Sequence, residues 1–324
     1  MWLCRALLAA CWLWGVDVIL WTDVLERPLL EWLMRGAVLL VLATLALDFA
    51  ARYRVRDLID SMALIALVGV LLALLFAPSF AFADYPRTLI TRALGAFTFF
   101  GFEMWALFLL LMGAANAYYQ RVFWLVALLL GFFWGIWLRW SPEFAALFAP
   151  IAPLTALGLA GALFAGIVLL AGVARRLLRR TSVQALDFRL SLVGSLSMAL
   201  VIVGLFMVRV LQGALDTSQV FISLLLAGVA WAILWFRRSE RRGMLLERIL
   251  PPPTPSTPAL GVGALIFIGS VMFAYHLPLV GAANLNQYWL MEMGFGLAGF
   301  AWYPVMAGAT ALGGVDQQMR RREL

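Results

Sequence analysis

A few ionisable side chains lie inside, or at the edge of, segments that are otherwise apolar. They are Asp17, Arg35, Asp48, Glu103, Arg209, His276 and Glu292. A charge within a bilayer costs several kcal/mol, so such a side chain needs a partner or a water-filled cavity, and it often marks a transport or relay site. We therefore predict that six of them bind a substrate or an ion: Glu103, Glu292, His276, Asp17, Arg35 and Arg209.

Glu103 is the acidic residue placed deepest in its apolar segment. It lies about ten residues from the start of that segment, which at 1.5 Å per residue is about 15 Å and near the middle of a bilayer. No basic residue lies close to it within the same segment. Two states follow from this position. The carboxyl group is either protonated and inert, or hydrated by a cavity and able to bind protons or cations reversibly.

Two ion pairs are expected from the spacing of charges. Asp48 and Arg52 are four residues apart, which places them on neighbouring turns of one helix. Asp17 falls late in the first apolar segment and Arg35 falls early in the second. Consecutive antiparallel helices bring these two side chains to a similar depth, so we predict that they pair, either as a staple between helices or as part of a site.

Polar side chains also gather between the ninth and tenth apolar segments. His276 is followed by Asn284, Asn286 and Gln287, and then by Glu292. These residues either line a polar site that opens to the outer side or belong to an ordinary helix-capping loop.

Missing residue types exclude several kinds of chemistry. The chain has one histidine, no lysine and two cysteines. It cannot supply two His ligands to a haem, an H-E-x-x-H zinc site, a retinal Schiff base or the lysine of a phosphate-binding loop. We therefore expect no cofactor and no metal site.

The elements that must hold these residues are membrane-spanning helices. Of 324 residues, 65% are hydrophobic and 13% are charged, whereas a soluble domain is about 25% charged. Apolar runs of roughly 20 residues suit a helix that crosses the bilayer. We predict an all-α, polytopic bundle of about ten spans at 2–21, 32–50, 61–82, 93–117, 122–138, 151–173, 190–210, 220–236, 259–280 and 288–312.

The spans are expected to form a single membrane domain, residues 1–324. Its main eight-helix bundle would be 1–250, followed by a Pro-rich cytoplasmic strap at 251–258 and by a C-terminal helix pair with a short tail at 259–324. Gly131 and Gly135 are spaced for close helix packing, with dimerisation as the alternative.

The distribution of arginine predicts the orientation. All 24 basic residues are Arg, and a cytoplasmic N-terminus leaves only six on the outer side: Arg27, Arg35, Arg87, Arg92, Arg139 and Arg209. The positive-inside rule then places both termini in the cytoplasm. We expect an integral protein of a prokaryotic inner (cytoplasmic) membrane, with anionic lipids as partners of the cytoplasmic Arg-rich loops and no nucleic-acid partner.

Two Arg-rich cytoplasmic stretches, 174–189 and 237–250, are longer than a simple connection. They are expected to be amphipathic helices on the membrane surface that dock a protein partner, or else extensions of the spanning helices.

Three classes of function fit these features. The first is a transporter or permease-like protein with a polar site open to the outer side. The second is a non-catalytic membrane subunit of a larger complex. The third is an integral membrane enzyme that acts on a lipid-linked substrate. A cavity that reaches Glu103 would favour transport, a broad partner face without a cavity would favour a subunit, and clustered carboxylates open to lipid would favour an enzyme.

Overall fold

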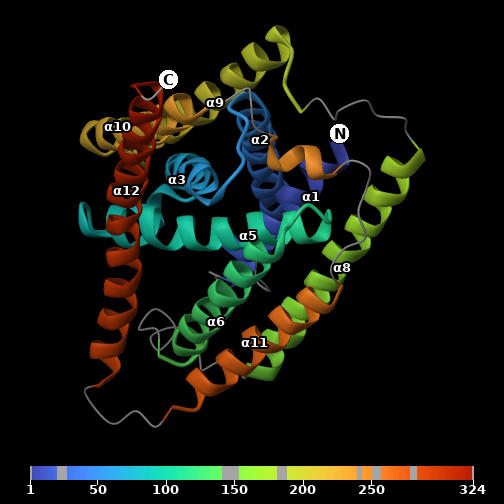
Figure 1. Ribbon diagram of the computed structural model, residues 1–324. Coiled ribbons are helices and arrows are strands. Elements are labelled where there is room, and N and C mark those ends of the chain that lie inside the picture. The colour runs from blue at the N-terminus through green and yellow to red at the C-terminus, as the bar shows by residue number, and fades with distance from the viewer. Residues whose placement is uncertain are drawn as a thin grey trace. The chain divides into compact units, whose positions relative to one another are not determined.

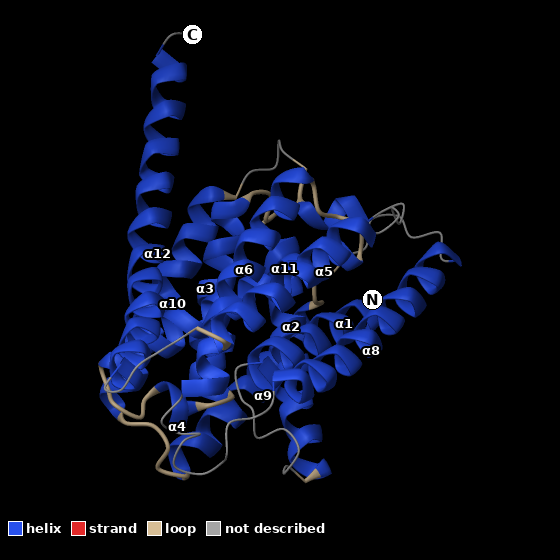
Figure 2. Ribbon diagram, turned by 90° about the horizontal axis from the view of Figure 1, so that it is seen from below, coloured by secondary structure: helices blue, strands red, loops and turns tan. Residues whose placement is uncertain are grey.

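The computed structural model describes residues 2–19, 28–140, 153–180, 188–238, 243–249, 257–277 and 283–322. Within these ranges every regular element is a helix, as the colouring of Figure 2 shows. The predicted all-α class is therefore confirmed.

Ten of the described segments are long and apolar enough to cross a membrane, and each corresponds to one of the ten predicted spans. They are Trp2–Ile19, Leu29–Arg52, Leu58–Leu75, Leu89–Leu111, Ala117–Arg139, Pro153–Leu177, Leu192–Leu211, Thr217–Arg237, Thr257–Tyr275 and Met293–Leu312. These helices indicate a polytopic membrane protein.

The helices follow one another with short connections. Their bounds are α1 Trp2–Trp12, η1 Leu13–Ile19, α2 Leu29–Arg52, α3 Leu58–Leu75, α4 Pro78–Ala81, η2 Leu89–Ala96, α5 Phe97–Leu111, α6 Ala117–Trp140, α8 Pro153–Arg180, α9 Leu192–Leu211, α10 Thr217–Arg237, η3 Leu245–Ile249, α11 Thr257–Tyr275 and α12 Ala283–Arg322. The η1 and η2 segments are π-helices, which are rare and often accompany functional sites. The η1 segment follows α1 directly and η2 leads directly into α5, so two of the spans change helix type partway.

Proline explains two differences from the predicted bounds. The third span ends at Leu75 and not at 82, because Pro78 cannot continue a helix and instead begins the short α4. The strap predicted for 251–258 was expected to be free of helix, but α11 begins at Thr257 and includes Pro258. Proline is tolerated in the first turn, where the backbone N–H has no intrahelical partner. Residues 251–256 of the strap lie outside the described part of the chain.

The two Arg-rich stretches differ from each other. Residues 174–180 continue α8 without a break, so this part is an extension of a span, and 181–187 lie outside the described residues. The second stretch contains the end of α10 and the single-turn η3. Leu245, Leu246 and Ile249 of η3 are buried. The amphipathic surface helix predicted over 237–250 is therefore wrong for the described residues 243–249, because their apolar side chains are covered by protein.

The chain forms two compact units. Unit 1 contains Met1–Ala43, Phe99–Leu186 and Glu247–Gly294, and unit 2 contains Thr44–Thr98, Asp187–Leu246 and Phe295–Leu324. The finer subdivision at residues 250 and 258 stays a prediction.

In unit 1, α6 packs along α11 (Figure 1). The Gly131-x-x-x-Gly135 spacing allows this approach, since a Cβ atom at Gly131 would lie only 2.6 Å from the carbonyl oxygen of Phe267. Ser270 Oγ donates a hydrogen bond to the carbonyl oxygen of Leu128 at 2.7 Å in the same interface. The prediction of close helix packing is thus confirmed within the chain itself. The α8 helix lies against α1, η1 and α11.

In unit 2, α3 packs against α10 and also contacts α4, η2 and α9. Glycines again permit a close approach, because a Cβ atom at Gly299 of α12 would lie 2.7 Å from the backbone nitrogen of Gly95. The α9 helix is different, since none of its residues is buried. This helix therefore makes little contact with the described protein.

Candidate functional site

A partly open cavity of about 100 Å³ lies in unit 1 between five helical segments. Its walls come from η1, α5, α6, α8 and α11. Glu103 is the only ionisable residue among the lining residues, and nearly all the others are aliphatic or aromatic. The site is therefore an apolar chamber with a single carboxyl group.

The carboxyl group of Glu103 makes no hydrogen bond or ion pair with the residues that the structure describes. The residue is 5% exposed, and its buried Oε2 atom has no hydrogen-bond partner. Glu103 lies eight residues before the end of α5 at Leu111, which is about 12 Å along the helix axis and deep within a bilayer. The other acidic side chains described within the spans all pair with arginine: Asp17, Glu31, Asp48 and Asp60. A buried polar group without a hydrogen-bond partner needs an explanation, and a ligand that binds to the carboxyl group of Glu103 would provide one.

Aromatic rings form much of the cavity wall. Trp14 of η1 donates a hydrogen bond from Nε1 to the carbonyl oxygen of Ala160 on α8, at 2.9 Å. This bond fixes the indole beside Phe164, with ring centroids 5.3 Å apart. Phe123 from α6 and Phe267 from α11 complete the set. Aromatic faces attract cations when the charge lies within about 6 Å of the ring centroid.

Together these features favour one kind of ligand. A bare carboxylate is costly in an apolar chamber, so Glu103 is stable there when it is neutral or when a cation lies beside it. The aromatic rings add a second attraction for positive charge. The chamber is partly open, so a cationic group can lie beside Glu103 while the rest of its molecule extends out of the chamber.

The structure brings two of the predicted site residues together. Arg35 Nη1 donates to Asp17 Oδ1 at 2.7 Å, which confirms the predicted ion pair. Arg35 also contacts Glu31 one turn away, at 2.7 Å. The predicted pair of Asp48 and Arg52 is likewise confirmed, at 3.0 Å. None of these residues lines the cavity at Glu103.

The remaining candidates lie elsewhere. His276 is exposed in the turn after α11, where its ring meets that of Tyr275 edge to face. Arg209 belongs to unit 2 and donates to the carbonyl oxygens of Leu75 and Phe76, so it caps the end of α3. Glu292 lies in α12, but the side chains of 283–292, including Asn284, Asn286 and Gln287, are outside the described part of the chain.

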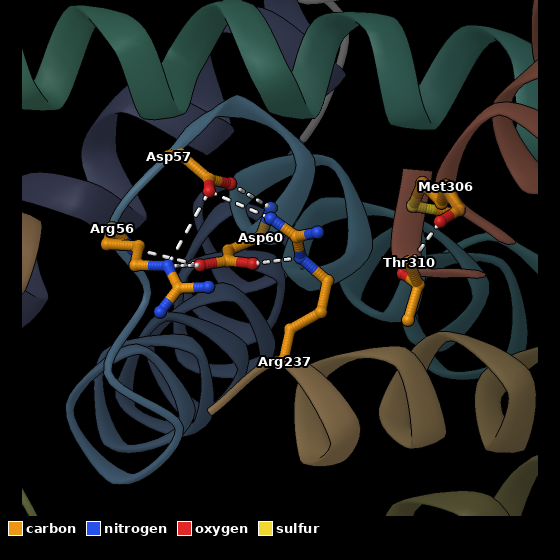
Figure 3. A network of polar contacts seen from close by, with 6 residues as sticks. All are labelled: Arg56, Asp57, Asp60, Arg237, Met306 and Thr310. Carbon is orange, nitrogen blue, oxygen red and sulfur yellow. Dashed lines mark hydrogen bonds and ion pairs between the residues drawn. The ribbon is translucent and has the colours of Figure 1, made fainter. Parts of the chain in front are cut away.

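A second group of charges joins the α2–α3 turn to the end of α10 in unit 2. Figure 3 shows Arg56, Asp57, Asp60 and Arg237 directed toward one another. Arg237 donates to Asp60 at 2.6 Å and to Asp57 at 2.8 Å. Asp57 also caps α3 by accepting a hydrogen bond from the backbone N–H of Asp60. The charges of the two arginines balance those of the two aspartates. The network therefore has a structural role, because it connects the start of α3 to the end of α10.

Among the described residues, no group of three or more His, Cys, Asp or Glu side chains is arranged to hold a metal ion. Comparison with known proteins adds no relative, because no protein-family model, curated protein or solved structure matches this chain.

The buried position of Glu103 was predicted from the sequence, but the aromatic wall around it was not. The chain has 23 Phe and 14 Trp. The sequence does not distinguish the aromatic residues that line a cavity from those that only pack between helices. The change from α1 to η1 was equally invisible, since π-helices have no simple sequence signal.

Proposed function

We propose that this chain is a membrane transporter of the permease kind, and that the cavity at Glu103 is its substrate site. The observation that carries this proposal is the buried carboxyl group of Glu103, which has no partner among the described residues and lies in a chamber with an aromatic wall. A membrane subunit was expected to have no cavity at Glu103. An enzyme was expected to expose clustered carboxylates, whereas Asp57 and Asp60 are balanced by arginines.

The proposed substrate is a small, mostly apolar molecule with one positive charge. The neutral carboxyl group releases its proton when the cation enters, which leaves a carboxylate paired with the cation and one proton outside the cavity. The charge within the membrane is then unchanged by the exchange, so neither state bears an isolated charge. Cation and proton therefore move in opposite directions, one for one.

The orientation belongs to the same proposal. Both termini lie in the cytoplasm of a prokaryotic cell, and the site opens at some stage of the cycle to the outer side, near His276 and Glu292. The excess of arginine on the inner side supports this arrangement.

Flux in proteoliposomes tests the proposal. The purified full chain is reconstituted around radiolabelled benzyltrimethylammonium and a pH-sensitive dye, and a proton gradient is applied from outside. We expect release of the cation together with entry of one proton per cation. Glu103→Gln removes the ionisable group but keeps the shape, so it should abolish both fluxes.

The matched control is Asp84→Asn, which removes an exposed carboxylate with a 63% exposed side chain. It should leave both fluxes unchanged. Cation release that is equal in protein-free liposomes, or that persists in Glu103→Gln, would overturn the assignment.

A further inference from the structure

The cavity at Glu103 is open on one side. Glu103, Leu107 and Leu130 are buried in its wall. Two of the lining residues are exposed in the described part of the chain, Gly161 on α8 and Ile268 on α11. Ile268 is 43% exposed. The α8 and α11 helices lie against each other in unit 1 (Figure 1). The cavity therefore opens between these two helices.

Two glycines in the cavity wall show the same difference between its sides. A Cβ atom at Gly161 would meet open space, because nothing lies within 4 Å of that position. A Cβ atom at Gly263 of α11 would instead collide with the Phe123 ring of α6. The contact of α6 with α11 thus closes one side of the cavity, whereas the α8 side leaves room for part of a ligand.

The opening lies well inside two spans. Gly161 is eight residues after Pro153, where its span begins. Ile268 is seven residues before Tyr275, where its span ends. At 1.5 Å per residue, both are about 10 Å or more from the ends of their helices. The α8 helix has no charged residue before Arg175, and α11 has none. In a bilayer whose hydrocarbon core is about 30 Å thick, an opening at this depth meets acyl chains and not water.

Both sides of the opening carry apolar side chains. Leu163 on α8 and Leu265 on α11 are 40% and 72% exposed. Phe164 and Phe267, one from each helix, line the cavity and are half-buried. Their ring faces can attract a cation inside the cavity, while the opening itself offers only apolar surface. This arrangement suits a molecule with a cationic group at one end and an apolar group at the other.

We infer that the cation exchanges between Glu103 and the lipid bilayer through the opening between α8 and α11. The ligand is an amphiphilic cation. Its charged group lies beside Glu103, and its apolar part extends through the opening into the acyl chains, where it is removed from water. The inference rests on the cation site proposed at Glu103, and it adds the class of ligand and the route.

Two carbodiimides test the route in the full chain reconstituted in nanodiscs. Dicyclohexylcarbodiimide dissolves in lipid and a water-soluble carbodiimide does not, so each reports access to Glu103 from one phase. We expect only the lipid-soluble reagent to modify Glu103. Gly161→Trp should prevent this modification because the indole fills the opening, and Ile268→Trp repeats the test from α11 if Gly161→Trp does not fold.

Gly166→Trp is the matched control for this route. Gly166 lies on α8 outside the cavity, and nothing lies within 4 Å of its Cβ position, so this variant should be modified like the unchanged protein. Equal modification of Gly161→Trp and Gly166→Trp would overturn the route. Modification of Glu103 by the water-soluble reagent at the same rate as by the lipid-soluble one would overturn it as well.

A photoreactive ligand locates the apolar part. Benzyldimethylbutylammonium with a diazirine on its butyl chain is bound to the full chain and illuminated, and the adducts are mapped by mass spectrometry. We expect adducts on α8 and α11 beside Gly161 and Ile268, and their loss in Glu103→Gln. The cation site is measured separately, as protection of Glu103 from dicyclohexylcarbodiimide by benzyltrimethylammonium. Protection with adducts confined to other helices would overturn this inference alone, whereas absence of protection would overturn the cation site as well.

Discussion

Asp17 of η1 and Arg35 of α2 form an ion pair of 2.7 Å in which the aspartate is fully buried and the arginine side chain is 25% exposed. Removing one partner of a buried pair costs about 3–5 kcal/mol because the other charge is left without compensation. Arg35 is partly exposed and also contacts Glu31. Both features reduce the contribution of the Asp17–Arg35 pair to the stability of the protein.

We expect Arg35→Gln to destabilise the protein by about 3 kcal/mol in reversible unfolding with denaturing detergent. The double variant Asp17→Asn, Arg35→Gln should recover part of that loss, because two neutral side chains replace two charges. Interaction energies between contacting residues are about 0.5–3 kcal/mol. Strictly additive losses would show that the two residues do not stabilise each other.

The α6–α11 interface offers a second test. Gly131→Ala places a methyl group against the backbone of Phe267, which cannot move aside as a flexible side chain can. Overpacking of this kind costs about 1–3 kcal/mol. Gly269→Ala on α11 is the matched control, since nothing lies within 4 Å of its Cβ position. Thermal unfolding in detergent should separate the two variants, and equal melting temperatures would argue against tight packing at Gly131.

Arg237 should be a stabilising residue of unit 2. It contacts Asp60, which is 3% exposed, and Asp57. We expect Arg237→Gln to cost about 3 kcal/mol or more, because Asp60 loses a close partner while remaining buried. The neighbouring Arg238 is exposed and lies over the Trp235 ring at 3.9 Å, so Arg238→Gln should cost no more than about 1 kcal/mol. If Arg238→Gln lost more stability than Arg237→Gln, the assignment of Arg237 as the stabilising residue would be wrong.

Membrane orientation can be measured with single cysteines in intact cells. The starting protein carries Cys4→Ala and Cys11→Ala, since both native cysteines are buried. Asp84→Cys lies in the connection between the third and fourth spans and should react with an impermeant reagent, while Arg238→Cys should react only after the cells are opened. The reverse pattern would invert the proposed topology.

Much of the fold was predictable because a bilayer imposes one simple rule. Each span must be a helix of about 20 apolar residues, so the number of spans and the approximate bounds could be predicted from the sequence. The Asp48–Arg52 and Asp17–Arg35 pairs were predictable because unpaired charges are costly in the membrane. The helix bounds near proline differ from the predicted ones, since α4 begins at Pro78 and α11 already includes Pro258.

The walls of the candidate site could not be predicted. Trp14, Phe123, Phe164 and Phe267 come from four different helical segments, and their convergence depends on tertiary packing that apolar periodicity does not encode. Arg139, which caps α11 through the carbonyl oxygen of Tyr275, was likewise counted only as a topological charge. Partner docking at 174–189 and 237–250 stays a prediction.

Chemical modification of Glu103 tests the proposed site most directly. Dicyclohexylcarbodiimide is apolar and reacts with protonated carboxyl groups, so mass spectrometry of the full chain should find its adduct on Glu103 and not on the exposed Asp84. Benzyltrimethylammonium should protect Glu103, and neopentylbenzene, which has the same shape without the charge, should not. Phe164→Leu should weaken the protection by up to about tenfold, as a desolvated cation–π contact is worth roughly 1–2 kcal/mol. Modification of Glu103 at the same rate with and without the cation would contradict a cation site at this residue.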